Sequence, residues 1–147
     1  MSRITQVIKR ILGKTKNRNL AVIEDFRANN GQVGGFFRDK SLLLLHTTGA
    51  KSGNKHIIPL IYLQDGDRFV IIASKGGAQS NPDWYYNLVT NPKVKVELGK
   101  EEFVANAVVV QEPERSLLFN RMTERYPFYA EYQRKTDRII PVIILSR

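Results

Sequence analysis

Short apolar segments of strand length alternate with turns of a few residues over most of the chain between residues 41 and 110. Leu42–His46 and Arg68–Ala73 are two such segments, and the Asp65-Gly66-Asp67 sequence before the second one is typical of a hairpin turn. A connection between parallel strands of one sheet needs about a dozen residues or more. The short connections therefore predict an α+β protein that is mainly β, an antiparallel β-barrel with flanking helices rather than an alternating βαβ sheet.

We expect about six strands and three or four helices from the periodicity of apolar residues. Asn81 is expected to cap one of the helices, with Pro82 at its first position. Pro59 interrupts one of the strands and predicts an outer strand or a bulge, because proline cannot donate to a ladder. The remaining strands are expected at His56–Leu63, Val94–Leu98, Phe103–Val110 and Ile139–Leu145, and the helices at Leu20–Arg27, Asp83–Thr90, Pro113–Arg125 and Tyr126–Lys135.

Length and composition limit the kinds of site that the chain can hold. Its 147 residues predict one domain, and the absence of cysteine excludes disulfides, thiolate zinc sites, iron–sulfur clusters and a cysteine nucleophile. The two histidines, His46 and His56, are too few for most histidine-rich metal sites, and no metal site is expected. No apolar run approaches the roughly 20 residues of a membrane-spanning helix. The N-terminus lacks the pattern of a secretory signal, so a cytoplasmic location is expected.

Positive charge is concentrated at the N-terminus. Of the net charge of +9, +6 falls within residues 1–20, and the nearly balanced remainder argues against a nucleic-acid-binding barrel. We expect residues 1–19 to form a basic amphipathic segment and a linker over Lys14–Asn19, and residues 20–147 to form the single domain. The basic amphipathic segment is expected to form a helix that either packs on its own domain or lies on an anionic membrane surface. Its apolar residues have the spacing of one helix face: Ile4, Val7, Ile8, Ile11 and Leu12.

Two basic, glycine-containing loops stand close to the ends of predicted strands. Thr47–Lys55 and Ser74–Gly77 can offer backbone N–H groups, hydroxyls and ammonium groups to a phosphate or a carboxylate. For either loop taken alone, a solvated hairpin turn is the favoured interpretation. Neither loop fits the phosphate-binding loop or the dinucleotide fingerprint. His46 ends an apolar run and is expected to be structural, whereas His56 is placed where it could reach a phosphate.

Two groups of aromatic residues follow these loops. Trp84, Tyr85 and Tyr86 fall on one predicted helix and could flank a planar ring, although core packing is the commoner role of such a cluster. Tyr126, Tyr129 and Tyr132 repeat every three residues and are expected to share roughly one helix face. Their phenols could line an apolar slot and donate a proton to a carbonyl oxygen, or they could simply close the barrel.

Several motifs occur in a fixed order along the chain. They are Thr47-Thr48-Gly49-x-Lys51-Ser52-Gly53, Pro59-Leu60, Asp65-Gly66-Asp67-Arg68, Ala73-Ser74-Lys75-Gly76-Gly77, Asn81-Pro82-x-Trp84-Tyr85-x-Asn87-Leu88-x-x-Asn91-Pro92, Tyr126-Pro127-x-Tyr129-x-x-Tyr132 and Thr136-Asp137-Arg138-x-Ile140-Pro141. This set resembles the motifs of the deazaflavin-dependent nitroreductase family, the quinone reductases that use reduced coenzyme F420. The resemblance covers roughly residues 20–145, and the ordered set is specific although each motif is weak alone.

The resemblance implies a split β-barrel related to the flavin-binding oxidase barrels, with a deazaflavin in a groove and its anionic tail on the basic loops. It implies hydride transfer from reduced F420 to a menaquinone-like quinone or, incidentally, a nitroaromatic acceptor. The implied cofactor-binding residues are Lys51, Ser52, His56, Ile57, Ile58, Pro59, Leu60, Ile61, Ala73, Ser74, Lys75, Trp84, Tyr86 and Asn87. The implied catalytic residues at the acceptor are Ser74, Tyr126, Tyr129 and Tyr132.

Three further expectations follow from the resemblance. Many family members carry arginine where this chain has Ala50, so the cofactor tail is expected to bind more weakly unless Lys55 compensates. A quinone that resides in the bilayer gives the basic segment over residues 1–18 a role in peripheral membrane association. The alternatives are an enzyme on the same barrel that uses FMN and a non-catalytic cofactor carrier; the oligomeric state is left open.

Overall fold

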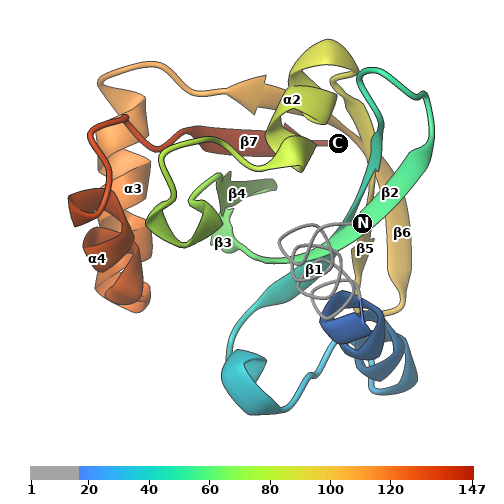
Figure 1. Ribbon diagram of the computed structural model, residues 1–147. Coiled ribbons are helices and arrows are strands. Elements are labelled where there is room, and N and C mark those ends of the chain that lie inside the picture. The colour runs from blue at the N-terminus through green and yellow to red at the C-terminus, as the bar shows by residue number, and fades with distance from the viewer. Residues whose placement is uncertain (1–16) are drawn as a thin grey trace, which may run out of the picture.

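The computed structural model describes residues 17–147, and its centre is one antiparallel sheet (Figure 1). The strands are β1 (Leu42–Thr48), β2 (Lys55–Ile61), β3 (Leu63–Asp65), β4 (Arg68–Ile72), β5 (Lys93–Leu98), β6 (Glu101–Val109) and β7 (Val142–Ser146). Their order is β2-β1-β5-β6-β7-β4-β3, and every pair is antiparallel. The sheet curls on itself with β2 and β3 as its outer strands. The predicted split β-barrel is thereby confirmed.

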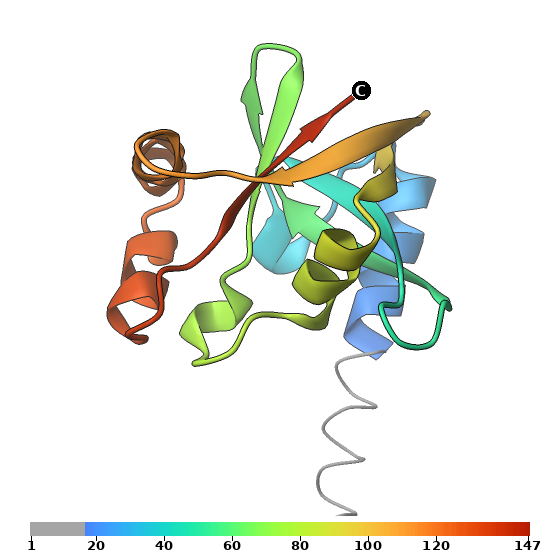
Figure 2. The same cartoon turned by 90° about the horizontal axis from the view of Figure 1, so that it is seen from above.

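Helices cover the sheet from different sides. The helix over residues 17–28 lies on one side of the barrel, and α3 (Glu114–Arg125) and α4 (Phe128–Arg134) lie together on the other (Figures 1 and 2). The short helix α2 (Asp83–Thr90) leads into β5, and two 3-10 turns, η1 (Gly35–Phe37) and η2 (Lys75–Gly77), lie in loops. The helices predicted around 20–27, 83–90, 113–125 and 126–135 are all present.

Both faces of the sheet are buried, which explains the uninterrupted apolar runs in β1, β4 and β7. Successive side chains of a strand point to opposite faces. On β1, Leu42 and Leu44 accordingly join one core with the helix over 17–28 and α3, whereas Leu43 and Leu45 join a second core with α2. All four leucines are at most 4% exposed. The second core lies mainly between the strands themselves, with Trp84 and Leu88 of α2 packed against it, so both faces of the sheet are covered.

The number of strands differs from the expectation, because the segment predicted as one strand over 56–63 forms two. β2 ends at Ile61, β3 begins at Leu63, and the Tyr62 N–H between them donates to the Ser41 carbonyl at 3.0 Å. There are therefore seven strands in the described residues. Pro59 lies on the outer strand β2, which pairs residue for residue with β1, so the outer-strand prediction is right and there is no bulge in this pairing.

Two predictions about helix ends are wrong. Asn81 does not cap α2: Pro82 holds the cap position, and Asn81 Oδ1 instead accepts a hydrogen bond from Arg138 at 2.6 Å. The linker predicted over Lys14–Asn19 is helical at residues 17–19. The remainder of that linker and the amphipathic helix predicted near the N-terminus lie outside the described residues.

A buried carboxylate fastens the helix over 17–28 to the sheet. Glu97 on β5 is only 6% exposed, and its two oxygens accept hydrogen bonds from Arg27 at 3.1 and 2.8 Å. His46 Nε2 lies 2.6 Å from Glu97 Oε2, which agrees with the structural role predicted for this histidine. The hydrogen bonds from Arg27 hold the pKa of Glu97 below its usual range; burial opposes this and His46 adds to it.

We expect Glu97→Gln to lower the free energy of unfolding by about 2 kcal/mol at neutral pH, a modest value for a buried carboxylate because Arg27 is half exposed. A carboxylate whose pKa is lowered by folding stabilises the fold above its unfolded-state pKa and loses that contribution as pH falls through the folded value. The difference between wild type and Glu97→Gln should therefore shrink below about pH 4.5, the ordinary pKa of a glutamate. Urea unfolding at several pH values checks this, with exposed Glu102→Gln as the control. Equal losses for both variants would contradict the account.

Candidate functional site

Both basic loops predicted to bind an anion lie at the same edge of the barrel. The antiparallel register places the end of β1 beside the start of β5, and the end of β4 beside the start of β7. The pairing of β6 with β5 and β7 joins these strand ends into one edge. Figure 2 shows the β1–β2 loop, α2, η2 and α4 along this edge, with the β3–β4 hairpin on the opposite side. The fold thus gathers segments that are far apart in the sequence.

The first loop is fastened to α2 by Asn87, a residue that is 9% exposed. Its Oδ1 accepts a hydrogen bond from the Ala50 N–H at 3.0 Å, and its Nδ2 donates to Thr47 Oγ1 at 3.3 Å. The sequence predicted that Asn87 contacts the cofactor. In the structure its amide is engaged by the loop itself, so its geometry is that of a residue that holds the loop in place.

The donor groups of this loop face solvent and suit an anionic ligand. Lys51, Ser52 and His56 are exposed, and Lys55 Nζ donates to Thr48 Oγ1 at 2.9 Å. The hydroxyl of Ser52 and the ring of His56 meet over Gly49, where an added Cβ would lie 2.5 Å from Ser52 Oγ and 3.2 Å from His56 Nε2. Ammonium, hydroxyl and imidazole groups on one loop are the donor set that a polyanionic cofactor tail requires.

The predicted ring-binding strand is the outer strand β2, whose far edge has no partner strand in the described sheet. Backbone N–H and C=O groups on such an edge are open to a ligand. The side chains of this strand alternate in exposure: Pro59 and Ile61 are buried, and Ile57, Ile58 and Leu60 are half-buried. Its main chain is therefore better placed than its side chains to meet a flat ring.

The second loop packs tightly against the end of α4. Ala73 is fully buried, Ser74 is half-buried and Lys75 is exposed. Gly77 has a φ of +85°, and a Cβ added there would lie 2.6 Å from the Tyr132 carbonyl oxygen. Gln79 Nε2 also donates to the Lys135 carbonyl at 3.1 Å. Ser74 and the tyrosine-bearing helix are in this way held side by side.

The three predicted tyrosines converge, although not as the spacing suggested. Tyr126 is the residue that follows α3, so the three do not share one helix face. Tyr126 and Tyr129 are each 6% exposed, Tyr132 is half-buried, and the rings of Tyr129 and Tyr132 meet edge to face at 5.9 Å. Of these three tyrosines, only Tyr126 makes a hydrogen bond through its hydroxyl to another residue within 17–147. It accepts from the Ser41 N–H at 3.1 Å.

The surroundings of the tyrosines change their acidity in opposite directions. Burial raises the pKa of Tyr129, so its phenol stays protonated through the neutral range. For Tyr126, burial also acts to raise the pKa, but the hydrogen bond from Ser41 and the nearby positive charge of Arg125 outweigh it and the net pKa is lowered. Tyr126 is thus engaged with the protein, and Tyr129 and Tyr132 keep their hydroxyls for another partner.

The aromatic residues of α2 separate onto two faces of the helix. Trp84 is 6% exposed and packs in the core with Phe69 and Leu88, whereas Tyr86 is 48% exposed. Tyr86 meets Tyr85 edge to face at 5.4 Å. Residues two positions apart on a helix do not share a face, and the sequence motif alone does not show this. A ligand on the solvent side of α2 would meet Tyr86, and Trp84 would support the helix from behind.

Sequence reasoning missed Arg138 as a site residue, although it stands in the Thr136-Asp137-Arg138 motif. Its guanidinium donates to the Ser74 carbonyl of the second loop, to the Ala73 and Ala78 carbonyls on either side of that loop, and to Asn81, at 2.6–3.3 Å. Backbone acceptors leave no mark in a sequence, so spacing could not reveal this contact. The only available signal was the motif itself.

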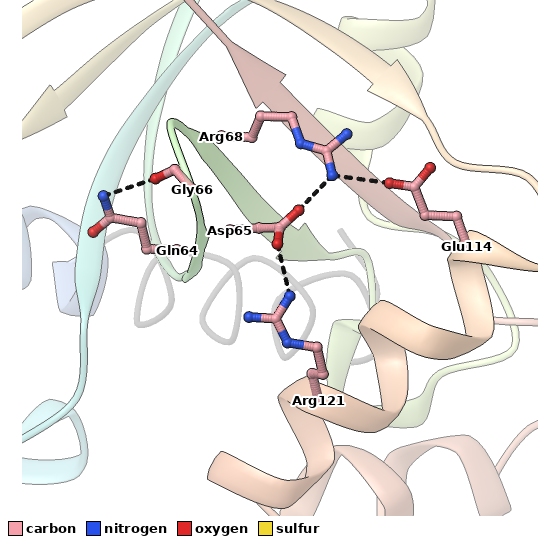
Figure 3. Close-up of polar contacts among 6 residues, drawn as sticks. All are labelled: Gln64, Asp65, Gly66, Arg68, Glu114 and Arg121. Atoms are coloured by element: carbon pink, nitrogen blue, oxygen red, sulfur yellow. Dashed lines mark hydrogen bonds and ion pairs between the residues drawn. The ribbon is translucent and has the colours of Figure 1, made fainter.

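Other polar groups lie away from this edge. A polar cavity of about 450 Å³ sits at the opposite ends of β1 and β5, lined among others by Ser41, Tyr62 and Gly99. Figure 3 shows an ionic network that ties the β3–β4 hairpin to α3: Arg121 donates to Asp65 at 2.7 Å, and Arg68 donates to both Asp65 and Glu114. These arginines lower the pKa of Asp65. Over residues 17–147, no three histidine, aspartate or glutamate side chains gather into a possible metal site.

Comparison with known proteins connects this arrangement to a family. The family model described as F420H(2)-dependent quinone reductase matches residues 19–147. An F420H(2)-dependent quinone reductase of Mycobacterium tuberculosis is 40% identical over 126 residues, which cover 83% of this chain and 85% of that protein.

Solved structures agree with the fold. A structure described as an F420-H2 dependent reductase superposes with a TM-score of 0.67 at 40% identity, covering 77% of this chain and 100% of that one. A putative pyridoxamine 5′-phosphate oxidase from Listeria innocua shares the fold alone, with a TM-score of 0.51 at 13% identity over 71% of this chain and 82% of that one.

Proposed function

Because the chain belongs to the F420H(2)-dependent quinone reductase family, we propose that the barrel edge bearing the two basic loops and α4 is its active site. The protein is an oxidoreductase that takes electrons from F420H2 and delivers them to a quinone. The observation that carries the placement of the site is the packing of Gly77 against Tyr132, since it holds the Ser74 loop beside the tyrosines. The second loop and the tyrosines are then neighbours on one edge of the barrel, and the first loop lies along the same edge.

In this proposal the first loop holds the anionic tail of the cofactor. Lys51 supplies the main positive charge, and Ser52 and His56 donate hydrogen bonds beside it. The backbone of Ile57–Ile61 lies along the ring system, and Ala73, Ser74 and Lys75 contact it from the end of β4. Tyr86 closes the site from the exposed face of α2. When bound, the reduced deazaflavin supplies the hydride.

The acceptor in this proposal is a menaquinone-like quinone, with nitroaromatic reduction as an incidental activity. The Ser74 hydroxyl orients the quinone oxygen, and a tyrosine of α4 donates the proton that accompanies hydride transfer. Tyr129 supports this assignment through its raised pKa and its free hydroxyl, and Tyr132 through its place beside the Ser74 loop. A neutral phenol is a proton donor throughout the neutral range.

Lys51→Ala tests the role given to the first loop. We expect the KM for F420H2 to rise about tenfold with a small change in kcat. The substitution removes one partner of a phosphate or carboxylate of the cofactor, and this contact is lost equally in the bound ground state and in the transition state. Lys100→Ala is the matched control, since it removes an exposed lysine after β5, at the opposite end of the sheet. An equal KM for wild type and Lys51→Ala would contradict the role of this loop.

We further propose that the basic N-terminal segment brings the enzyme to the inner face of the cell membrane, where a bilayer-resident quinone is found. The support is the sequence: six basic residues and no acidic one within residues 1–20, interleaved with an apolar helix-face pattern. Among the helices within residues 17–147, none combines the length and the apolarity needed to cross a bilayer.

Deletion of residues 1–18 should abolish sedimentation with anionic lipid vesicles and leave turnover with a soluble quinone intact. The reason is that about 1 kcal/mol of attraction to an anionic surface is lost with each basic residue near it. Neutral phosphatidylcholine vesicles serve as the control. Unchanged vesicle binding after the deletion would contradict the proposed membrane role. Loss of soluble-quinone turnover would show that the segment instead supports the structure of the barrel.

A further inference from the structure

Arg138 is bound to the second loop by more hydrogen bonds than any other side chain there. Its Nη2 donates to the Ser74 carbonyl at 2.9 Å, its Nε donates to the Ala78 carbonyl at 2.8 Å, and Nη1 and Nη2 both lie 3.3 Å from the Ala73 carbonyl. Among the ion pairs of residues 17–147, none involves Arg138. Its charge is thus directed at backbone carbonyls, and burial lowers its pKa without removing that charge.

The contact fixes the direction of two peptide groups. In a trans peptide the carbonyl oxygen and the N–H of the next residue point to opposite sides. The carbonyls of Ala73 and Ser74 turn toward Arg138, so the N–H groups of Ser74 and Lys75 point away from it. Ser74 has helical backbone angles, φ −78° and ψ −39°, which keep the two successive peptide groups roughly parallel.

The two N–H groups are free donors within the described chain. Neither the Ser74 N–H nor the Lys75 N–H donates to another backbone or side-chain group within residues 17–147, whereas the neighbouring N–H groups of Ala73, Gly77 and Ala78 all do. Lys75 has a φ of +47°, which follows the helical Ser74 with a left-handed residue. This succession makes adjacent N–H groups converge on one side of the chain.

We infer that Arg138 is a positioning residue that orients the Ser74 and Lys75 N–H groups toward an oxygen of the bound cofactor. The inference rests on the proposed active site and adds a residue to it that does not touch the cofactor. A positive charge behind the two carbonyls also polarises both peptide groups, which strengthens the N–H donors on the far side. Only a planar guanidinium reaches the Ala73, Ser74 and Ala78 carbonyls together, since a lysine offers one ammonium at one point.

Arg138→Lys and Arg138→Met test this inference against Arg115→Lys. Arg115 is the matched control, because its half-buried guanidinium also donates to a backbone carbonyl, that of Ile140 at 2.7 and 3.1 Å, and makes no hydrogen bond to the second loop. Two readouts are needed. Hydrogen exchange of the peptide spanning residues 73–81 reports loop order without any cofactor, and fluorescence titration with oxidised F420 reports its Kd.

We expect both Arg138 variants to speed exchange in residues 73–81 and to raise the Kd for F420 about tenfold, with Lys retaining more affinity than Met. Arg115→Lys should lower the thermal midpoint by a similar amount and change the Kd less than twofold. If Arg138→Met fails to fold, Arg138→Lys carries the comparison.

Two outcomes overturn the inference. Unchanged exchange in residues 73–81 shows that Arg138 does not order the loop, and faster exchange with an unchanged Kd shows that the ordered loop does not serve the cofactor. Failure of the proposed function has a different signature. In that case wild type itself does not bind F420, whatever the exchange data show, and the inferred role toward the cofactor fails with it.

Discussion

Gly77→Ala is expected to lower kcat/KM for F420H2 at least tenfold and to lower the free energy of unfolding by about 2–3 kcal/mol. The added methyl group would lie 2.6 Å from the Tyr132 carbonyl oxygen and 3.0 Å from Lys135 Cβ, and the backbone φ of +85° is itself unfavourable for alanine. Because the neighbour is backbone rather than a rotatable side chain, the loop has to move off α4. That movement separates Ser74 from the tyrosines.

Gly76→Ala is the matched control for this prediction. Gly76 also has a positive φ, +64°, but nothing lies within 4 Å of a Cβ added there. Alanine at this position should cost only the left-handed backbone strain, about 1 kcal/mol. Steady-state kinetics and urea unfolding of both variants separate backbone strain from loss of the loop–helix contact. Equal effects of the two substitutions would show that the close packing of the loop on α4 does not matter.

Tyr129→Phe or Tyr132→Phe is expected to lower kcat for a quinone by about a hundredfold, the scale of losing a general acid. These two residues are the proposed proton donors because their hydroxyls carry no hydrogen bond to another described residue. The pKa of Tyr129, raised by burial, keeps its phenol protonated, so activity should not fall on the alkaline side below the ordinary tyrosine pKa of about 10. The pH profile of kcat for wild type and both variants checks this.

Tyr126→Phe serves as the control in the same panel. Its hydroxyl accepts the Ser41 N–H at 3.1 Å, so its removal leaves a backbone donor without that partner. The expected result is a loss of about 1–2 kcal/mol in stability with kcat within a few-fold of wild type. If Tyr126→Phe loses the most activity while Tyr129→Phe and Tyr132→Phe stay active, the assignment of the proton donor is wrong.

Most of the fold could be predicted because local signals and long-range packing agree. The Asp-Gly turn, the alternation in Val94–Leu98 and the proline at the start of α3 each point to the structure that forms. The division between β2 and β3 could not be predicted, because Tyr62 continues an apolar run and only its bond to Ser41 marks the break. The prediction that Asn81 caps α2 is wrong because its side chain accepts a hydrogen bond from Arg138, a residue 57 positions away.

The sequence motifs identified segments that the fold brings to one edge of the barrel, but not which way their side chains face. Family-like motifs located both loops and the tyrosines, but which face a side chain occupies depends on packing. Trp84 and Asn87 are buried, with Asn87 holding the first loop, and Arg138 holds the second. Such supporting residues act through backbone atoms, which every residue shares, so neither residue type nor spacing distinguishes them.

We propose that this barrel transfers hydride from F420H2 to a quinone. The most direct measurement is anaerobic mixing of the purified protein with F420H2 and menadione, following the return of the oxidised-deazaflavin absorbance. Parallel samples receive reduced FMN or NADH as the donor. We predict protein-dependent oxidation with F420H2 and none with the other two donors. Turnover with FMN or NADH but not with F420H2, or F420 binding without any turnover, would contradict the account.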